Sequence, residues 1–448
     1  MADRATPADP LAPIRSRRYL VLLLLAAVLG VPVAAAAYWF LQFSGALQEV
    51  VYSDLPHWLG FDHAPAWWPA PVLAFAGLLV GLTVRYLPGR GGDSPIDGFK
   101  AGKVNHPMAL PGIVLAAFAG LSLGAVLGPE APLVAMGGGL AYLAVWLAKR
   151  DVPQQAAAVV AATGSFAAIS TLLGSPLTGA FLLLEASGLG GPTASMVLVP
   201  GLLGAGTGAL IFVGLNSLTG YGPHSLAIPN LPPIHPPSAT EFLWAVAVGL
   251  AAAPLCWAIR RLARLLRPHV DRWPVLLTPV VGLVIGGIAI GYAAATGRAS
   301  AEVLFSGQSA LPGLLIHGAS YPASAVLLLA AGKALAYSVA LSGFRGGPTF
   351  PAMFVGAAAG VALSHLPGLG LVAAAGMGIA AMTSGILRLP MTATLLTTLF
   401  LDGNGVTLLP LVIVSAVVSY VLTVRLNPPP RPEERPAIIG DPAGSNAP

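Results

Sequence analysis

The chain has 448 residues, of which 56% are hydrophobic and only 9% are charged, with a mean hydropathy of +0.80 and a formal net charge of +5. A soluble protein carries roughly 25% charged residues, so the composition excludes that class and predicts a polytopic integral membrane protein. The single cysteine, Cys256, excludes an intrachain disulfide framework and a cysteine-based metal site. The small positive charge lies in loops and chain ends, so we expect no nucleic-acid partner, and no metal or cofactor is indicated.

The N-terminal segment 1–18 is polar and basic, and the apolar run 19–43 after it is long enough to cross a ~30 Å hydrocarbon core. This run is too long for a signal peptide and lacks a cleavage site, so it predicts a retained first helix. The arginines before it favour a cytoplasmic N-terminal tail in the plasma (inner) membrane. Two further basic clusters mark cytoplasmic ends: Lys149-Arg150 and Arg260-Arg261-Arg264-Arg267.

Many more apolar segments follow, and several are too short to cross a membrane alone with certainty. They are 66–87, 109–127, 131–148, 155–170, 175–187, 192–219, 241–265, 275–296, 323–342, 351–364, 369–384, 390–401 and 406–424. Short pieces are expected where half-helices enter from each side and stop near the midplane, lining a wet cavity. The Pro-rich stretch 220–238 is predicted to link a first half, 66–219, to a second half, 239–425. Residues 426–448 are expected to form a short cytoplasmic tail, which leaves 19–425 as the transmembrane domain.

The two halves repeat each other. Gly128-Pro129-Glu130-Ala131-Pro132 returns as Gly347-Pro348-Thr349-Phe350-Pro351, and Pro176-Leu177-Thr178-Gly179 returns at nearly the same spacing as Pro390-Met391-Thr392-Ala393. Duplicated halves with interrupted helices indicate a midplane site between repeats. The predicted fold is therefore an all-α polytopic membrane protein of two inverted-topology halves with broken and re-entrant helices.

Glu130 is the only formal charge between Lys103 and Lys149. A carboxylate at membrane depth costs at least ~2.5–3.5 kcal/mol and is usually functional. Three Gly-rich stretches, 91–98, 128–132 and 342–351, would bring backbone N–H groups and helix N-termini toward one point, which binds an anion without a full cation. Ionised Glu130 would occupy that site until it is protonated or displaced. The candidate anion-binding residues are Gly91, Gly92, Ser94, Gly128, Ala131, Gly346, Gly347, Thr349 and Phe350.

Four motifs resemble those of one family of transporters. Residues 128–132 resemble its G-[KR]-E-G-P motif, 346–351 its G-x-F-x-P filter, 176–185 its A-P-L-[AT]-G-x-L-F-x-x-E stretch, and 386–392 its R-A-P-L-T signature. Over about 70–425 the chain is similar to the CLC family of chloride channels and chloride/proton antiporters, as a short prokaryotic-type member without C-terminal regulatory domains. The resemblance implies transport of chloride or a similar small anion, Glu130 as the external gate, and a homodimer with one pathway in each subunit.

The chain also departs from the family pattern. Glu130 is flanked by Pro129 and Ala131, the first filter motif G-S-G-I-P is degraded at 91–96, and the filter phenylalanine position holds Thr349. The inner-gate tyrosine has no clear counterpart. The second acid that exchangers commonly carry directly after the position of Glu185 is Ala186. We therefore expect passive or weakly proton-coupled anion movement, with Glu185 a candidate for the proton pathway and strict chloride/proton exchange as the alternative.

Plainer interpretations stay open. Glu130 could pair with Arg345 or Lys333, either of which could instead shape the anion potential, and Glu185 could simply bond backbone N–H groups. Asp93 is expected to cap a helix. An intramembrane enzyme, suggested by Gly307-Gln308-Ser309-Ala310, would leave the duplicated Gly-Pro motif unexplained, so an enzyme is not expected.

Overall fold

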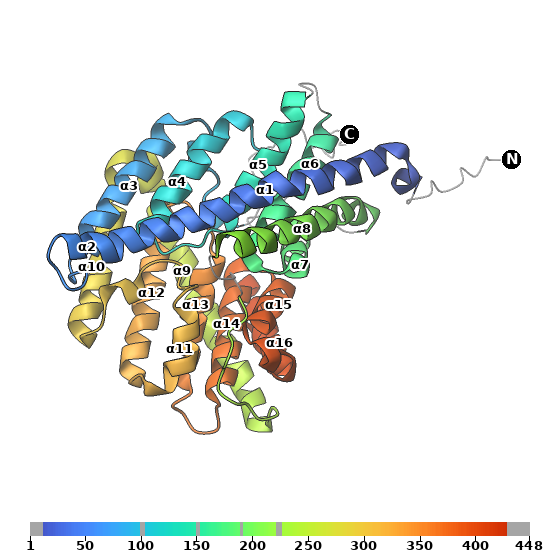
Figure 1. Ribbon diagram of the computed structural model, residues 1–448. Helices are drawn as coiled ribbons and strands as arrows, with labels where there is room; N and C mark the ends of the chain where they lie inside the picture. The colour runs from blue at the N-terminus through green and yellow to red at the C-terminus, as the bar shows by residue number, and fades with distance from the viewer. Residues whose placement is uncertain (1–11, 99–103, 149–152, 189–190, 221–225, 428–448) are drawn as a thin grey trace, which may run out of the picture.

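The fold consists of α-helices joined by short turns (Figure 1). The computed structural model describes residues 12–98, 104–148, 153–188, 191–220 and 226–427. Within these ranges there is no β-strand, only one isolated two-residue bridge, which confirms the predicted all-α class. The helices are α1 (Arg17–Glu49), α2 (Leu55–Trp58), α3 (Pro69–Tyr86), α4 (Leu110–Ser122), α5 (Glu130–Ala148), α6 (Gln154–Leu173), α7 (Pro176–Ser187), α8 (Gly191–Thr219), α9 (Ala239–Arg272), α10 (Pro274–Thr296), α11 (Leu311–His317), α12 (Ala323–Gly343), α13 (Thr349–Leu363), α14 (Leu371–Leu387), α15 (Pro390–Phe400) and α16 (Gly405–Leu426).

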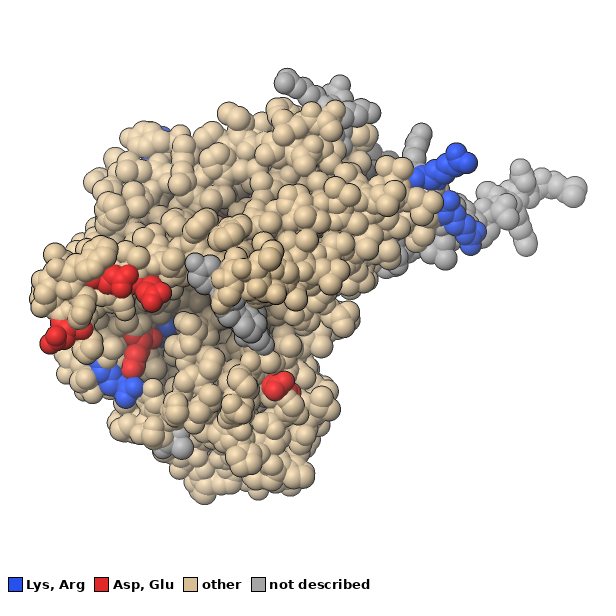
Figure 2. Space-filling view, in the orientation of Figure 1, with Lys and Arg blue, Asp and Glu red and all other residues tan. Residues whose placement is uncertain are grey.

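The outer surface is suited to lipid. Nine helical stretches in the described part of the chain are long and apolar enough to cross a membrane. Large apolar side chains point outward from several of them, among them Leu24, Leu210 and Leu243. Figure 2 shows one face on which charged side chains are few and most of them gather toward the left and right ends, with a broad uncharged surface elsewhere. An exposed apolar surface of this extent identifies a multi-pass membrane protein.

The first helix is longer than its apolar run. It begins at Arg17, where the side chain of Ser16 accepts a hydrogen bond from Tyr19 N, and it continues past Phe43 to Glu49 and then through a π-helical turn into α2. Its polar end is held because Gln48 Nε2 donates to Leu121 O at 3.0 Å. Hydropathy alone therefore placed the end of the helix too early.

The two halves occupy largely opposite sides of the molecule, with α3–α8 in one and α9–α16 in the other (Figure 1). The linker is in contact with the second half, since Ile228 N donates to Phe400 O at 3.1 Å and Ile228 is buried. Residues 1–11, 221–225 and 428–448, which include most of both predicted tails and part of the linker, lie outside the described residues. The predicted boundaries of the halves and tails stay predictions.

The internal repeat is visible in how helices cross. In the first half, α5 and α6 cross where a Cβ atom on Gly137 would collide with Gly164 O. In the second half, α13 and α14 cross in the same way at Gly356 and Gly378. Glycines at such crossings let two backbones approach closely, which is how membrane helices gain van der Waals contact.

Adding one methyl group at this crossing should destabilise the protein. Gly356→Ala places a Cβ against the backbone of Gly378, which cannot yield as a flexible side chain would. We expect overpacking to lower the free energy of unfolding by about 1–3 kcal/mol, measured by thermal unfolding in detergent. The matched control is Gly287→Ala on α10, where the added atom meets nothing within 4 Å. A control that loses as much stability as Gly356→Ala would contradict the role of the crossing.

Candidate functional site

The site is built around one pair of glycines, one from each half. Gly128 N donates to Gly347 O at 2.7 Å, and Gly347 N donates back to Gly128 O, which forms the isolated antiparallel bridge. Both residues are buried. The pair ties the start of α5 to the start of α13, and the reciprocal bonds are what a two-fold relation between the halves requires. The repeated Gly-Pro frames predicted from the sequence therefore meet.

Glu130 is the first residue of α5 and is fully buried, with 0% of its surface exposed. Its Oε1 accepts a hydrogen bond from Phe350 N at 2.8 Å, so the acid of the first half caps the first turn of α13 in the second half. The first N–H groups of a helix have no partner within it and carry a partial positive charge, so a carboxylate is stabilised there. The side chain occupies the position that an exogenous anion would take at this helix end.

Two polar atoms beside this bond are unsatisfied. Glu130 Oε2 and Thr349 Oγ1 are buried close together, and neither makes a hydrogen bond of good geometry to a described residue. Oε2 lies against Gly128 and Gly347, and a Cβ atom on either glycine would collide with the carboxylate. These two positions require glycine because the acid fills the space where a side chain would be.

Lys333 is not the partner of Glu130. Its ammonium group is fully buried on α12, donates to Leu304 O at 2.7 Å and to Glu302 O at 3.2 Å, and lies 4.3 Å from the centre of the Phe354 ring. Carbonyl oxygens and an aromatic face compensate for part of the desolvation of a buried cation. Lys333 therefore holds the turn at 302–304 in place.

Arg345 does not pair with Glu130 either. Its Nη1 lies within hydrogen-bonding distance of the carbonyl oxygens of Gly343 and Phe344, at 3.3 and 3.4 Å, and the residue is buried. Glu130 makes no ion pair with any residue that the structure describes, so the interpretation of this acid as half of a buried salt bridge is wrong.

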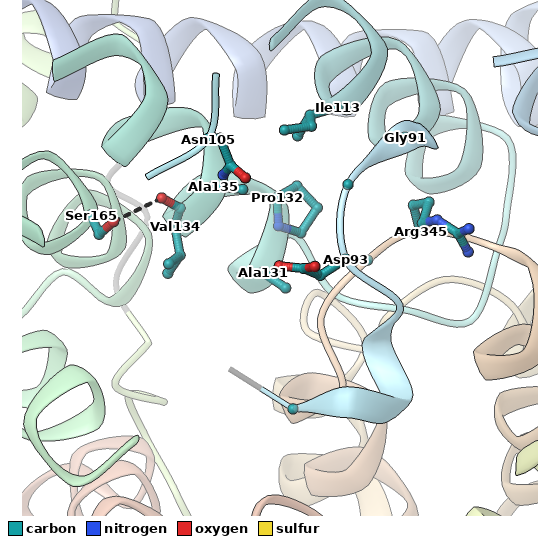
Figure 3. A pocket seen from close by; sticks show the side chains of 13 residues that line it. Gly91, Asp93, Asn105, Ile113, Ala131, Pro132, Val134, Ala135, Ser165 and Arg345 are labelled. Atoms are coloured by element: carbon teal, nitrogen blue, oxygen red, sulfur yellow. Dashed lines mark hydrogen bonds between the residues drawn. The ribbon is translucent and has the colours of Figure 1, made fainter. Parts of the chain in front are cut away.

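A small cavity lies beside the first turns of α5 (Figure 3). Its volume of about 40 Å³ is enough for a water molecule or a small ion. Four of the predicted anion-binding residues line it: Gly91, Gly92, Ala131 and Gly346. Gly91 and Gly92 have φ of 72° and 90°, a backbone that favours glycine, which allows the chain to turn here. The side chains of Asp93, Asn105, Ser165 and Arg345 also contribute to the wall.

Ser94 lies outside the wall of this cavity. It is the N-cap residue of the short helix η4 (Pro95–Asp97), although its side chain makes no capping bond and its buried Oγ has no partner among the described residues. Asp93, which we expected to cap a helix, precedes the cap and lines the cavity. The segment 91–96 thus reaches the cavity through its glycines and Asp93.

Glu185 acts across the two halves as well. From α7 its Oε1 accepts from Met391 N at 3.0 Å, and its Oε2 accepts from Thr392 N at 2.7 Å and from Thr392 Oγ1 at 2.6 Å. Both oxygens are therefore held at the N-terminus of α15. We expected Glu185 to bond neighbouring backbone N–H groups; it does accept from backbone N–H groups, but they belong to the other half.

Tyr337 is a site residue that the sequence analysis missed. Its side chain is fully buried on α12, and its hydroxyl donates to Pro348 O at 2.8 Å, directly before the turn that holds Glu130. A tyrosine inside an apolar span needs an acceptor for its hydroxyl, so its presence at 337 could have indicated a polar contact there from the sequence alone. The nearby Phe350 ring packs edge-to-face against Phe400, with ring centres 6.2 Å apart.

Comparison with known proteins now identifies the family. The sequence family described as "Voltage gated chloride channel" matches residues 76–423. The chain belongs to this family, the CLC family. It is 30% identical over 361 residues to the "Putative ion-transport protein YfeO" of Escherichia fergusonii, which covers 79% of this chain and 81% of that protein. The same values hold for the protein of that name in Escherichia coli.

Solved structures share the CLC fold at lower identity. A CLC-type fluoride/proton antiporter matches with a TM-score of 0.69 and 20% identity, covering 91% of this chain and 96% of that one. A slow cyanobacterial Cl⁻/H⁺ antiporter matches with a TM-score of 0.71 and 21% identity, covering 91% and 95%. These likenesses establish the CLC-like architecture of inverted halves that the sequence predicted.

The contact between Gly347 and Glu130 can be tested by stability alone. Gly347→Ala should lower the free energy of unfolding by about 1–3 kcal/mol, because its methyl group collides with the carboxylate. In a Glu130→Ala background the same change should be milder, with a non-additive term of at least about 0.5 kcal/mol. Thermal unfolding of the two single variants and the double variant measures this. Gly206→Ala, with nothing within 4 Å of the added atom, is the control that should behave additively. Strict additivity for Gly347→Ala would show that the contact is absent.

Proposed function

We propose that this CLC-family protein moves chloride or a similar small anion across the membrane, along a pathway that Glu130 closes. One observation carries the proposal: the carboxylate of Glu130 occupies the N-terminus of α13, which is an anion-binding position. While the acid is ionised it competes with the permeant anion for the same N–H groups. When it is protonated it loses its charge and with it the preference for this place, so the helix end becomes available.

The surrounding groups suit weak, reversible anion binding. The candidate ligands are backbone N–H groups and the unsatisfied Thr349 hydroxyl, which hold an anion without a full positive charge next to it. Conduction requires binding that is strong enough for entry and weak enough for release. Gly91, Gly92, Ala131 and Gly346 line the adjoining cavity, which supports their role as the continuation of the pathway.

The gate is tested by its response to pH. Anion flux from proteoliposomes should rise on acidification of the side that Glu130 faces, because protonation removes the competing charge. Glu130→Gln should give high flux that no longer changes with pH. The control Asp402→Asn replaces an exposed acid in the turn before α16 and should keep the pH response. An unchanged pH response in Glu130→Gln would show that the acid is structural only.

We infer passive or weakly proton-coupled movement, with strict exchange as the alternative. A proton carrier has to release its partners as it changes protonation state, yet the carboxylate of Glu185 accepts three hydrogen bonds at the start of α15. The neighbouring residue, Ala186, cannot titrate. A role of Glu185 in a proton pathway stays a prediction, and the geometry supports a clamp between the halves.

Coupling is tested in a planar bilayer under opposed chloride and proton gradients. We expect the reversal potential to follow the chloride gradient in the wild type and in Glu185→Gln, and to move little with the pH gradient. The same variant should lose about 0.5–2 kcal/mol of stability, as expected when a helix N-cap is lost. A reversal potential that shifts strongly with the pH gradient at fixed chloride would rule out passive movement.

Several finer features belong to the same proposal. We place the protein in the plasma (inner) membrane with a cytoplasmic N-terminus, as a homodimer with one pathway in each subunit. An intramembrane enzyme lacks support: Ser309 is exposed in the turn before α11, and no hydrogen bond joins it to a histidine in the part of the chain that the structure describes.

A further inference from the structure

Three arginines gather where α9 passes the ends of α14 and α16. Arg260 and Arg264 lie one turn apart on α9, and Arg388 lies between α14 and α15. Arg260 Nη1 donates to Ile386 O at 2.6 Å, two residues before Arg388, and Arg264 Nη1 donates to Asn427 Oδ1 at 3.2 Å, directly after α16. The three helices pack against one another, so the cluster is fixed by the fold.

No acid in the described part of the chain balances these charges. Among the described residues none of the three arginines forms an ion pair, although other arginines of this chain, such as Arg267 and Arg298, do. The guanidinium groups of Arg260 and Arg264 each lie close enough to that of Arg388 to be repelled by its positive charge. Neighbouring cations without a counter-ion destabilise a protein unless an anion joins them.

The cluster also has unused hydrogen-bond donors. The Nε atoms of Arg260 and Arg388 are buried and have no acceptor in the described part of the chain. A guanidinium group offers five N–H donors in a rigid plane, and one hydrogen bond is recorded for Arg260 and none for the side chain of Arg388. Buried donors of a charged group require acceptors.

The backbone at Arg388 adds an independent observation. Its φ of 59° is left-handed, and it ends α14 by donating its N–H to Ser384 O at 2.9 Å. Glycine is the usual residue at this position of a helix end, because other residues are strained there. An arginine at a position that favours glycine indicates that its side chain is needed.

We propose that Arg260, Arg264 and Arg388 form a second anion site, separate from the Glu130 site, that binds a phosphate-type oxyanion. One guanidinium group can donate two parallel N–H bonds to two oxygens of a tetrahedral oxyanion. A halide is a single atom and has no second acceptor for this arrangement. The oxyanion is either a free inorganic ion or the phosphate of an anionic lipid. The inference goes beyond the proposed transport and does not depend on the role of Glu130.

The probe for a free oxyanion is sulfate, added to the purified full-length protein at an ionic strength held constant with chloride. Sulfate should raise the unfolding temperature of the wild type with a saturable dependence. Arg388→Gln and Arg260→Gln should weaken the apparent affinity for sulfate at least tenfold. Arg388→Lys keeps the charge but loses the planar pair of N–H donors, so it should weaken the affinity too. Arg272→Gln, an exposed arginine further along α9, is the matched control and should bind as the wild type does.

The probe for a lipid is phosphatidylglycerol, compared with phosphatidylcholine by native mass spectrometry. Retention of phosphatidylglycerol by the wild type and its loss in Arg260→Gln and Arg388→Gln would identify the headgroup as the occupant. If these two variants do not fold, Arg264→Gln replaces an exposed side chain and should still weaken binding several-fold. The proposal is overturned if sulfate and phosphatidylglycerol act equally on the wild type and all cluster variants, or on none of them. Because binding is read without transport, failure here leaves the gate at Glu130 untouched.

Discussion

The reciprocal backbone pairing of Gly128 with Gly347 is the interaction on which the functional site depends. In the bilayer each N–H and C=O must find a partner within the protein, and these two residues satisfy each other. Their pairing brings the first turns of α5 and α13 together and so places Glu130 Oε1 on Phe350 N. Neither half contains a complete site, because the acid comes from one half and the helix end that it caps from the other.

Glycine and proline in this protein perform distinct tasks at this point. Glycine at 128 and 347 leaves space that the carboxylate of Glu130 fills, and the proline that follows each glycine precedes a helix start. The same exchange between halves recurs at Glu185, whose carboxylate caps α15. Acids of the first half thus cap two helices of the second, Glu130 at a fully buried point and Glu185 at a partly buried one.

Much of this arrangement was predictable from the sequence, because apolar runs and the duplicated Gly-Pro frame are strong local signals. The lone acid at 130 indicated where the candidate site lies, and the repeat indicated that 128 and 347 are equivalent. The repeat did not reveal that they touch, nor that Glu185 reaches a helix 206 residues along the chain at Met391, since such contacts depend on tertiary packing. Ser94 was favoured by residue type, yet the backbone turns at Gly91 and Gly92 leave it outside the cavity.

The burial of Cys256 has a practical consequence for the study of this protein. The only thiol of the chain is fully buried on α9 and lies 3.6 Å from Met382 O, so water-soluble alkylating reagents have no access to it in the folded protein. The folded native protein is therefore not expected to react with water-soluble thiol reagents. A cysteine introduced at an exposed position, for example at Asp402 in the turn before α16, can therefore be labelled without interference from the native thiol.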